Sequence, residues 1–282
     1  MAARVSTIWF VDVADPREAL SRYPQPDQNA AHDLAANLYP DKEFESLGPH
    51  PLSIAATVQP GYVFIGAYDG IHVVCSSELS TFLPSTVPPS WLGCRGSRTT
   101  MFVTSIPETA QGSFGFWENG ELRRAFAATP VDIVEDTGIP QTWELPYWAS
   151  RHPLRYPPGV LPDPQSLPFH PQQFAEAANL DWLGFRYTGR SRRNELDTTQ
   201  ILLWGFKIHR AGEGPKSVPV EPEPVPAATP DSTPRPDPPR EVHLPPTAGE
   251  SAPHAADGSA PPAADGNPPR RRGRLARYFG LK

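Results

Sequence analysis

Hydrophobic residues gather in compact runs along the first 210 residues, and most runs are rich in β-branched and aromatic side chains. Such runs are typical of β-strands. The first run, STIWFVDV at residues 6–13, has no polar alternation and predicts a buried strand. Further strands are predicted at 61–68, 71–79, 98–105, 112–128 and 199–209, and the dipeptide Asp69-Gly70 predicts a hairpin turn between the second and third runs.

The clearest local signal is a hairpin over residues 112–128. Two alternating runs flank Asn119-Gly120, the dipeptide that a two-residue type I′ turn prefers. Arg123 and Arg124 are consecutive and cannot point to the same face of a strand, so one of them is expected to be exposed. Four apolar residues of the hairpin are expected to face the core, namely Phe114, Phe116, Leu122 and Phe126.

Three helices are predicted from capping residues and apolar spacing. Asp15 and Pro16 fit the N-cap and the first position of a helix over residues 15–23. Asp27 can cap a second helix, which Pro40 stops. Its apolar residues fall on one face, namely Ala30, Ala31, Leu34, Ala35 and Leu38. A third helix is predicted to begin at Pro171, with an inner face of Phe174, Ala178 and Trp182.

The order of these elements indicates the fold class. One strand and two helices come first, strands and hairpins follow, and a helix and a strand come last. This order lacks the regular βαβα alternation of a doubly wound sheet. The predicted class is therefore α+β, with a mixed or mostly antiparallel sheet and a few flanking helices. Residues 140–170 contain eight prolines beside large aromatic rings, and they are predicted to form an ordered, extended loop over the body.

Composition divides the chain into three parts. Residues 1–210 are predicted to form a single globular domain. Residues 211–269 hold 17 of the 38 prolines and few large apolar residues, which predicts a disordered, Pro-rich, acidic linker with a net charge of −6. Residues 270–282 carry six basic and no acidic side chains, so the body also has a net charge of −6. An acidic body argues against nucleic-acid binding over a broad face.

The strand end at Asp12 and Asp15 is one candidate site. Two carboxylates there could hold a divalent metal ion and serve a hydrolase. The competing interpretation is that Asp15 only caps the following helix and Asp12 faces solvent.

A second candidate set is Asp69, His72 and Cys75. His72 and Cys75 are separated by an odd number of positions, so in a strand they face opposite sides and do not form a catalytic pair. The favoured interpretation is a turn aspartate and a buried cysteine that packs as a small apolar residue.

The third candidate is a pocket around the proline-rich segment, formed from aromatic rings, carboxylates and histidines. Its residues are Trp117, Glu118, Trp143, Tyr147, Trp148, His152 and His170, with Glu135, Asp136 and Glu144 nearby in sequence. The competing interpretation is that the rings pack the loop and that His170 caps the helix beginning at Pro171. No metal-ligand spacing and none of the common nucleotide, hydrolase or zinc motifs is present, so no cofactor is expected.

Several stretches also resemble one family. IWFVDVADPREAL, YVFIGAYDGIHVVCSSEL, the run from Trp117 through PYWASRHP, and LPFHPQQFAEAA together resemble an uncharacterised actinobacterial domain-of-unknown-function family over residues 4–210. The resemblance implies no activity, cofactor or catalytic residue, and it does not extend to the tail.

The basic C-terminal segment suggests a tethered docking motif. A flexible linker of this length spans on the order of 40 Å, so its tip reaches a partner away from the body. The tip's candidate binding residues are Arg270, Arg271, Arg272, Arg274, Arg277, Tyr278 and Phe279. A protein partner is favoured, and an anionic membrane surface is the alternative.

The two cysteines, the absence of a signal peptide and the absence of a long apolar run predict a cytoplasmic protein. The sequence therefore favours a cytosolic, non-enzymatic binding protein.

Overall fold

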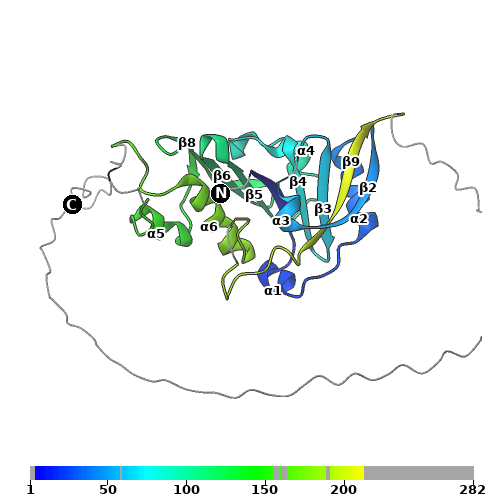
Figure 1. Cartoon of the computed structure of the whole chain (residues 1–282), viewed down its shortest axis with the longest axis horizontal. Helices are drawn as coiled ribbons and strands as arrows, with labels where there is room; N and C mark the ends of the chain where they lie inside the picture. Colours follow the sequence, from blue (N-terminus) through cyan, green and yellow to red (C-terminus); the bar gives the residue numbers. More distant parts are fainter. Residues whose placement is uncertain (1–3, 58, 155–158, 160–163, 189–190, 213–282) are drawn as a thin grey trace, which may run out of the picture. The chain divides into compact units, whose positions relative to one another are not determined.

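A nine-stranded antiparallel sheet organises the computed structural model, which describes residues 4–57, 59–154, 159, 164–188 and 191–212 (Figure 1). The strand order is β2-β9-β3-β4-β1-β5-β6-β7-β8, and every pairing is antiparallel. The predicted α+β class is therefore confirmed. The strands are β1 (Val5–Val11), β2 (Lys42–Pro51), β3 (Tyr62–Tyr68), β4 (Ile71–Ser76), β5 (Thr99–Ile106), β6 (Gln111–Glu118), β7 (Glu121–Ala128), β8 (Ile133–Gly138) and β9 (Leu202–Arg210).

The helices are short and lie between the strands. The α-helices are α1 (Pro16–Ser21), α2 (Gln28–Leu38), α3 (Leu52–Ala55), α4 (Pro89–Leu92), α5 (Leu145–Trp148) and α6 (Pro171–Leu183). Single 3₁₀ turns are η1 (Ser77–Leu79), η2 (Pro84–Thr86), η3 (Pro107–Thr109) and η4 (Thr142–Glu144). Helix starts follow the predicted caps, because Asp15, Asp27 and His170 each accept a hydrogen bond from the first turn of α1, α2 and α6.

Both faces of the sheet are buried at β1, which explains why this strand shows no alternation of apolar and polar residues. Trp9 and Val11 point into a core beneath α1, α3 and α6, and we name this side of the sheet the α6 face. Ile8 and Phe10 point into a second core beneath α2 and α4, on the side that we name the α2 face. Figure 1 shows β2 and β9 at one end of the sheet and β8 at the other.

The hairpin of β6 and β7 forms as predicted, with Asn119 and Gly120 at φ values of 51° and 79°. A β-bulge makes Arg123 an extra residue, because Phe116 pairs with Arg124 while Trp117 pairs with Leu122. The predicted core positions Phe114, Phe116 and Phe126 lie on the α6 face. Leu122 also packs against a core as predicted, but on the α2 face, because the bulge separates it from Arg124 and Phe126.

The same bulge decides between the two arginines. Arg123 is exposed, as expected for one of them, and forms ion pairs with Glu118 and Glu121. Arg124 is 0% exposed on the α6 face and forms a two-pronged ion pair with the equally buried Glu144, at 2.9 Å (Nε to Oε1) and 2.7 Å (Nη2 to Oε2). This ion pair fixes the segment with η4 and α5 to the sheet. The described part of the proline-rich segment contains these short helices and is not the single extended loop that was predicted.

Candidate functional site

A cleft of about 770 Å³ opens at one end of the central strands, on the α2 face. It lies where β1 and β6 end and β5 begins, between α4 and the turn that joins β6 to β7. Its volume falls in the range of small-molecule sites. The residues that line it are Asp12, Pro89, Leu92, Gly93, Gly96, Ser97, Arg98, Thr100, Trp117, Asn119 and Gly120.

Strand register explains why Thr100 and Trp117 lie together in the cleft. Phe10 is opposite Thr100 on β5, and Thr100 is opposite Trp117 on β6, so these side chains form one row on the α2 face. Phe10 is also opposite His72 on β4, which extends the row in the other direction. Trp117 is only 3% exposed, so it supplies an apolar wall together with Pro89 and Leu92.

Asp12 follows β1 directly and lies in the cleft. Its Oδ1 accepts a hydrogen bond from the backbone N–H of Arg98 at 2.7 Å. Asp15 points elsewhere, because its Oδ1 accepts from the N–H of Glu18 at 2.9 Å and caps α1. The two carboxylates thus have separate roles, and within the described part of the chain no three His, Cys, Asp or Glu side chains are grouped to hold a metal ion. The geometry gives the metal-dependent hydrolase alternative no support.

His72 and Arg95 form a contact beside the cleft. The Nη2 of Arg95 lies 2.6 Å from the Nε2 of His72, and because a guanidinium can only donate, the ring accepts at Nε2 and carries its proton on Nδ1. Burial lowers the pKa of His72 to about 4, the charge of Arg95 adds to this, and Asp12 opposes it. Cys75 lies on the other face, as the spacing predicted, and burial raises its pKa well above the usual range.

Four residues of the loop after α4 line the cleft, namely Gly93, Gly96, Ser97 and Arg98. The hydroxyl of Ser97 donates to the carbonyl of Thr99 and contacts the hydroxyl of Thr100, at 3.1 Å each. The side chains of Arg98 and Asn119 have no hydrogen-bond or ionic partner among the residues that the structure describes. These two groups and the Oδ2 of Asp12 are therefore free to contact a ligand.

The pocket predicted around the proline-rich segment does not exist as one site, because its residues lie on both faces of the sheet. Trp117 belongs to the α2 face, while Trp143, Tyr147 and Trp148 pack on the α6 core. The rings of Tyr147 and Phe174 are 5.0 Å apart, and Trp148 contacts the same helix. These rings therefore pack the loop, which was the competing interpretation.

The polar members of that set have local partners. His152 stacks on Tyr147 with ring centroids 4.0 Å apart. His170 accepts from the N–H of Gln172 at 3.3 Å and caps α6. Glu118 pairs with Arg123 at the end of the hairpin. Of the seven predicted residues, the cleft contains only Trp117.

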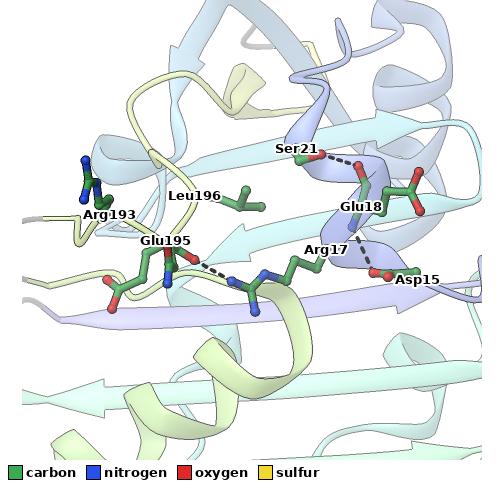
Figure 2. Close-up of a pocket in the computed structure, with 8 residues that line it drawn as sticks. Asp15, Arg17, Glu18, Ser21, Arg193, Glu195 and Leu196 are labelled. Carbon is green, nitrogen blue, oxygen red and sulfur yellow. Dashed lines mark hydrogen bonds between the residues drawn. The ribbon is translucent and has the colours of Figure 1, made fainter.

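A second pocket, of about 360 Å³, lies between α1 and residues 193–196 (Figure 2). Its polar groups mostly bond to one another. Arg17 donates to the carbonyl of Asn194 across the pocket, Ser21 donates to the carbonyl of Glu18, and Glu195 pairs with Arg186. Because fewer groups remain for a ligand, this pocket is the weaker candidate.

The sequence matches a described family over residues 5–206, which is more than half of the chain. The chain belongs to a family of unknown function (DUF6928). No curated protein and no solved structure matches it. The part shared with the DUF6928 family contains every residue of the cleft and excludes the basic segment at 270–282.

The tail residues proposed for docking lie outside the described residues, from Arg270 through Phe279. Across the part of the chain that is described, none of the helices has the length and apolar character to cross a membrane.

Most residues of the cleft were missed by sequence reasoning, although one signal pointed to them. Residues 93–98 read GCRGSR, a short run with two glycines and two arginines between an apolar segment and a strand. Glycines beside basic residues are common where a backbone approaches an anion. Asn119 and Gly120 were recognised only as turn residues.

Proposed function

We propose that this DUF6928 protein is a cytosolic, non-enzymatic binding protein that holds a small polar ligand in the cleft at the end of β1, β5 and β6. The observation that carries the proposal is the convergence of unpaired polar groups in a cavity of suitable size. Arg98, Asn119 and one oxygen of Asp12 face a cavity of about 770 Å³. Apolar walls with a few polar groups are the usual composition of a small-molecule site.

The geometry favours binding over catalysis. The hydroxyl of Ser97 donates to a backbone carbonyl, so it lacks a base that would activate it. His72 uses Nε2 to accept from Arg95 and is not paired with a nucleophile. Asp12 stabilises the loop at Arg98. Ser97, His72 and Asp12 are thus each held by a structural hydrogen bond.

The proposal is tested by screening small polar metabolites against the ¹⁵N-labelled full chain by NMR. The glycine amides provide reporters that do not depend on ligand charge, because Gly93, Gly96 and Gly120 line the cleft. We expect at least one compound to shift these three amides in a saturable manner. Compounds that shift only amides of residues 193–196 would move the site to the second pocket, and a screen without saturable shifts would refute the proposal.

We further propose that the basic segment tethers the domain to a protein partner. The support is the charge pattern of the sequence, with six basic residues following an acidic linker. Replacing Arg270, Arg271 and Arg272 by Ser should abolish recovery of a partner from host lysate. Replacing the linker residues Arg235 and Arg240 by Ser is the matched control and should leave recovery unchanged. Equal recovery of a partner by all chains would reject docking through the basic segment, and binding only to anionic vesicles would favour the membrane alternative.

A further inference from the structure

The loop at residues 93–98 presents unused backbone donors. The N–H groups of Arg95, Gly96 and Ser97 find no acceptor in the described part of the chain. Gly96 has a φ of 57°, and a Cβ at this position would meet no atom within 4 Å, so the backbone borders open space. Successive N–H groups in a turn form concavities that bind anions.

Two guanidinium groups accompany these donors. The side chain of Arg98 lines the cleft and has no acidic partner among the residues described. Arg95 contacts the neutral ring of His72 and has no acidic partner among the described residues. This short loop thus holds two arginines without an acidic partner in the described part of the chain, and arginine is well suited to phosphate oxygens.

Asp12 adds an acceptor to the same cleft. Its Oδ1 is used by the N–H of Arg98, so Oδ2 can accept a hydrogen bond from a ligand. A carboxylate repels a bare anion but binds a hydroxyl group well. The cleft therefore combines a donor-rich loop with one acceptor, and it is larger than a bare phosphate ion requires.

We propose that the ligand is a small hydroxylated phosphate ester, with its phosphoryl group on residues 95–98 and a hydroxyl group donating to Asp12. This inference rests on the proposed function, since it assigns a ligand class to the same cleft. It is a binding proposal and involves no bond cleavage.

The test uses ribose 5-phosphate, ribose and inorganic phosphate as probes of the full chain, with affinities from NMR titration of the cleft glycines. We expect ribose 5-phosphate to bind more tightly than either of the other two. Arg98→Ala should weaken its binding at least tenfold, because a charge-assisted contact is lost. Arg193→Ala is the matched control, since Arg193 is an exposed arginine of the second pocket (Figure 2), and it should leave affinity unchanged.

Asp12→Asn tests the contact with the hydroxyl group of the ligand separately from the contact with its phosphoryl group. Removing the negative charge should strengthen the binding of inorganic phosphate. The ratio of the affinity for ribose 5-phosphate to the affinity for inorganic phosphate should therefore decrease. Unchanged melting temperatures would show that Arg98→Ala remains folded, and Arg98→Lys should retain part of the affinity.

The possible outcomes test the ligand class separately from the proposal that the cleft is a binding site. Neutral or cationic compounds that shift the cleft glycines while all phosphates fail would overturn the phosphate ester but leave the binding site. Equal affinity of ribose 5-phosphate for wild type and Arg98→Ala would also overturn it. A complete lack of ligands for the cleft would refute both.

Discussion

Replacing Arg124 by Met should strongly destabilise the domain. Arg124 and Glu144 are both 0% exposed, and Arg124 also contacts Asp136. Removal of Arg124 leaves the carboxylate of Glu144 buried, and among the described residues only the N–H groups of Gln141 and Trp148 then donate to it. Breaking a buried ion pair from one side costs about 3–5 kcal/mol, whereas the volume of Met limits any added cavity cost.

The neighbouring arginine provides the control. Arg123 is exposed and pairs with Glu118 and Glu121, so Arg123→Met should change the free energy of unfolding by no more than about 1 kcal/mol. The double variant Arg124→Met and Glu144→Leu removes both buried charges. It should recover at least half of the loss caused by Arg124→Met alone, because no unpaired buried charge remains.

Urea unfolding of the full chain, followed by far-ultraviolet circular dichroism, measures these differences. Midpoints are compared at equal slope, so that a change in compactness is not taken for a change in stability. A loss below about 1 kcal/mol for Arg124→Met, or a double variant less stable than that single variant, would refute this account of the buried pair.

Three further predictions follow from single sites. His72 should lower stability as pH decreases from about 6.5 to 4, because its folded-state pKa is about 4 and it binds a proton more readily when unfolded. Glu176, whose pKa burial raises to about 7, acts in the opposite direction over the same pH range. The contribution of His72, at most about 3 kcal/mol, is therefore measured as the difference in the pH dependence of urea unfolding between wild type and His72→Gln. Gly112→Ala should lower the free energy of unfolding by more than about 2 kcal/mol, since a Cβ would lie 2.4 Å from a backbone oxygen of α6. Ala110→Gly, at a φ of 53°, should instead stabilise the domain by up to about 1 kcal/mol. Urea unfolding measures both, and a glycine variant less stable than the alanine variant would contradict the backbone geometry. Cys94, whose pKa burial raises to about 11, should react slowly with a thiol reagent at pH 8. Cys75 is fully buried and should react only when the domain unfolds. Equal reaction rates of the two thiols would contradict this difference in burial.

The central strands were predictable and the edge strands were not. β1, β3, β4, β5, β6, β7 and β9 coincide with apolar runs, because strands covered on one or both faces need such residues. β2 and β8 were missed. β2 contains Gly48, Pro49 and Pro51 with a register shift after Ser46, and β8 is mostly exposed. Prolines, bulges and charges are devices that protect an edge from further pairing, and they hide the strand pattern as well.

The candidate site was only partly accessible from sequence for a related reason. Asp12 and Trp117 were each singled out, but for different hypothetical sites, and the cleft joins them through strand register. Register between strands distant in sequence cannot be read from local periodicity. The sequence predicted a pocket of exposed rings at Trp143, Tyr147 and Trp148. A buried arginine instead fixes their segment against the sheet.

The extra residue at Arg123 determines which side chains of the hairpin lie on each face of the sheet. Without the bulge, Phe114 would be opposite Ala125, and Arg124 would point to the α2 face, away from Glu144. With it, Arg124 and Phe126 lie beneath α6 and the 141–148 segment, while Leu122 stays opposite Trp117 on the α2 face beside the cleft. One inserted position thus lets a single hairpin contribute a buried ion pair to one face and an apolar wall to the other.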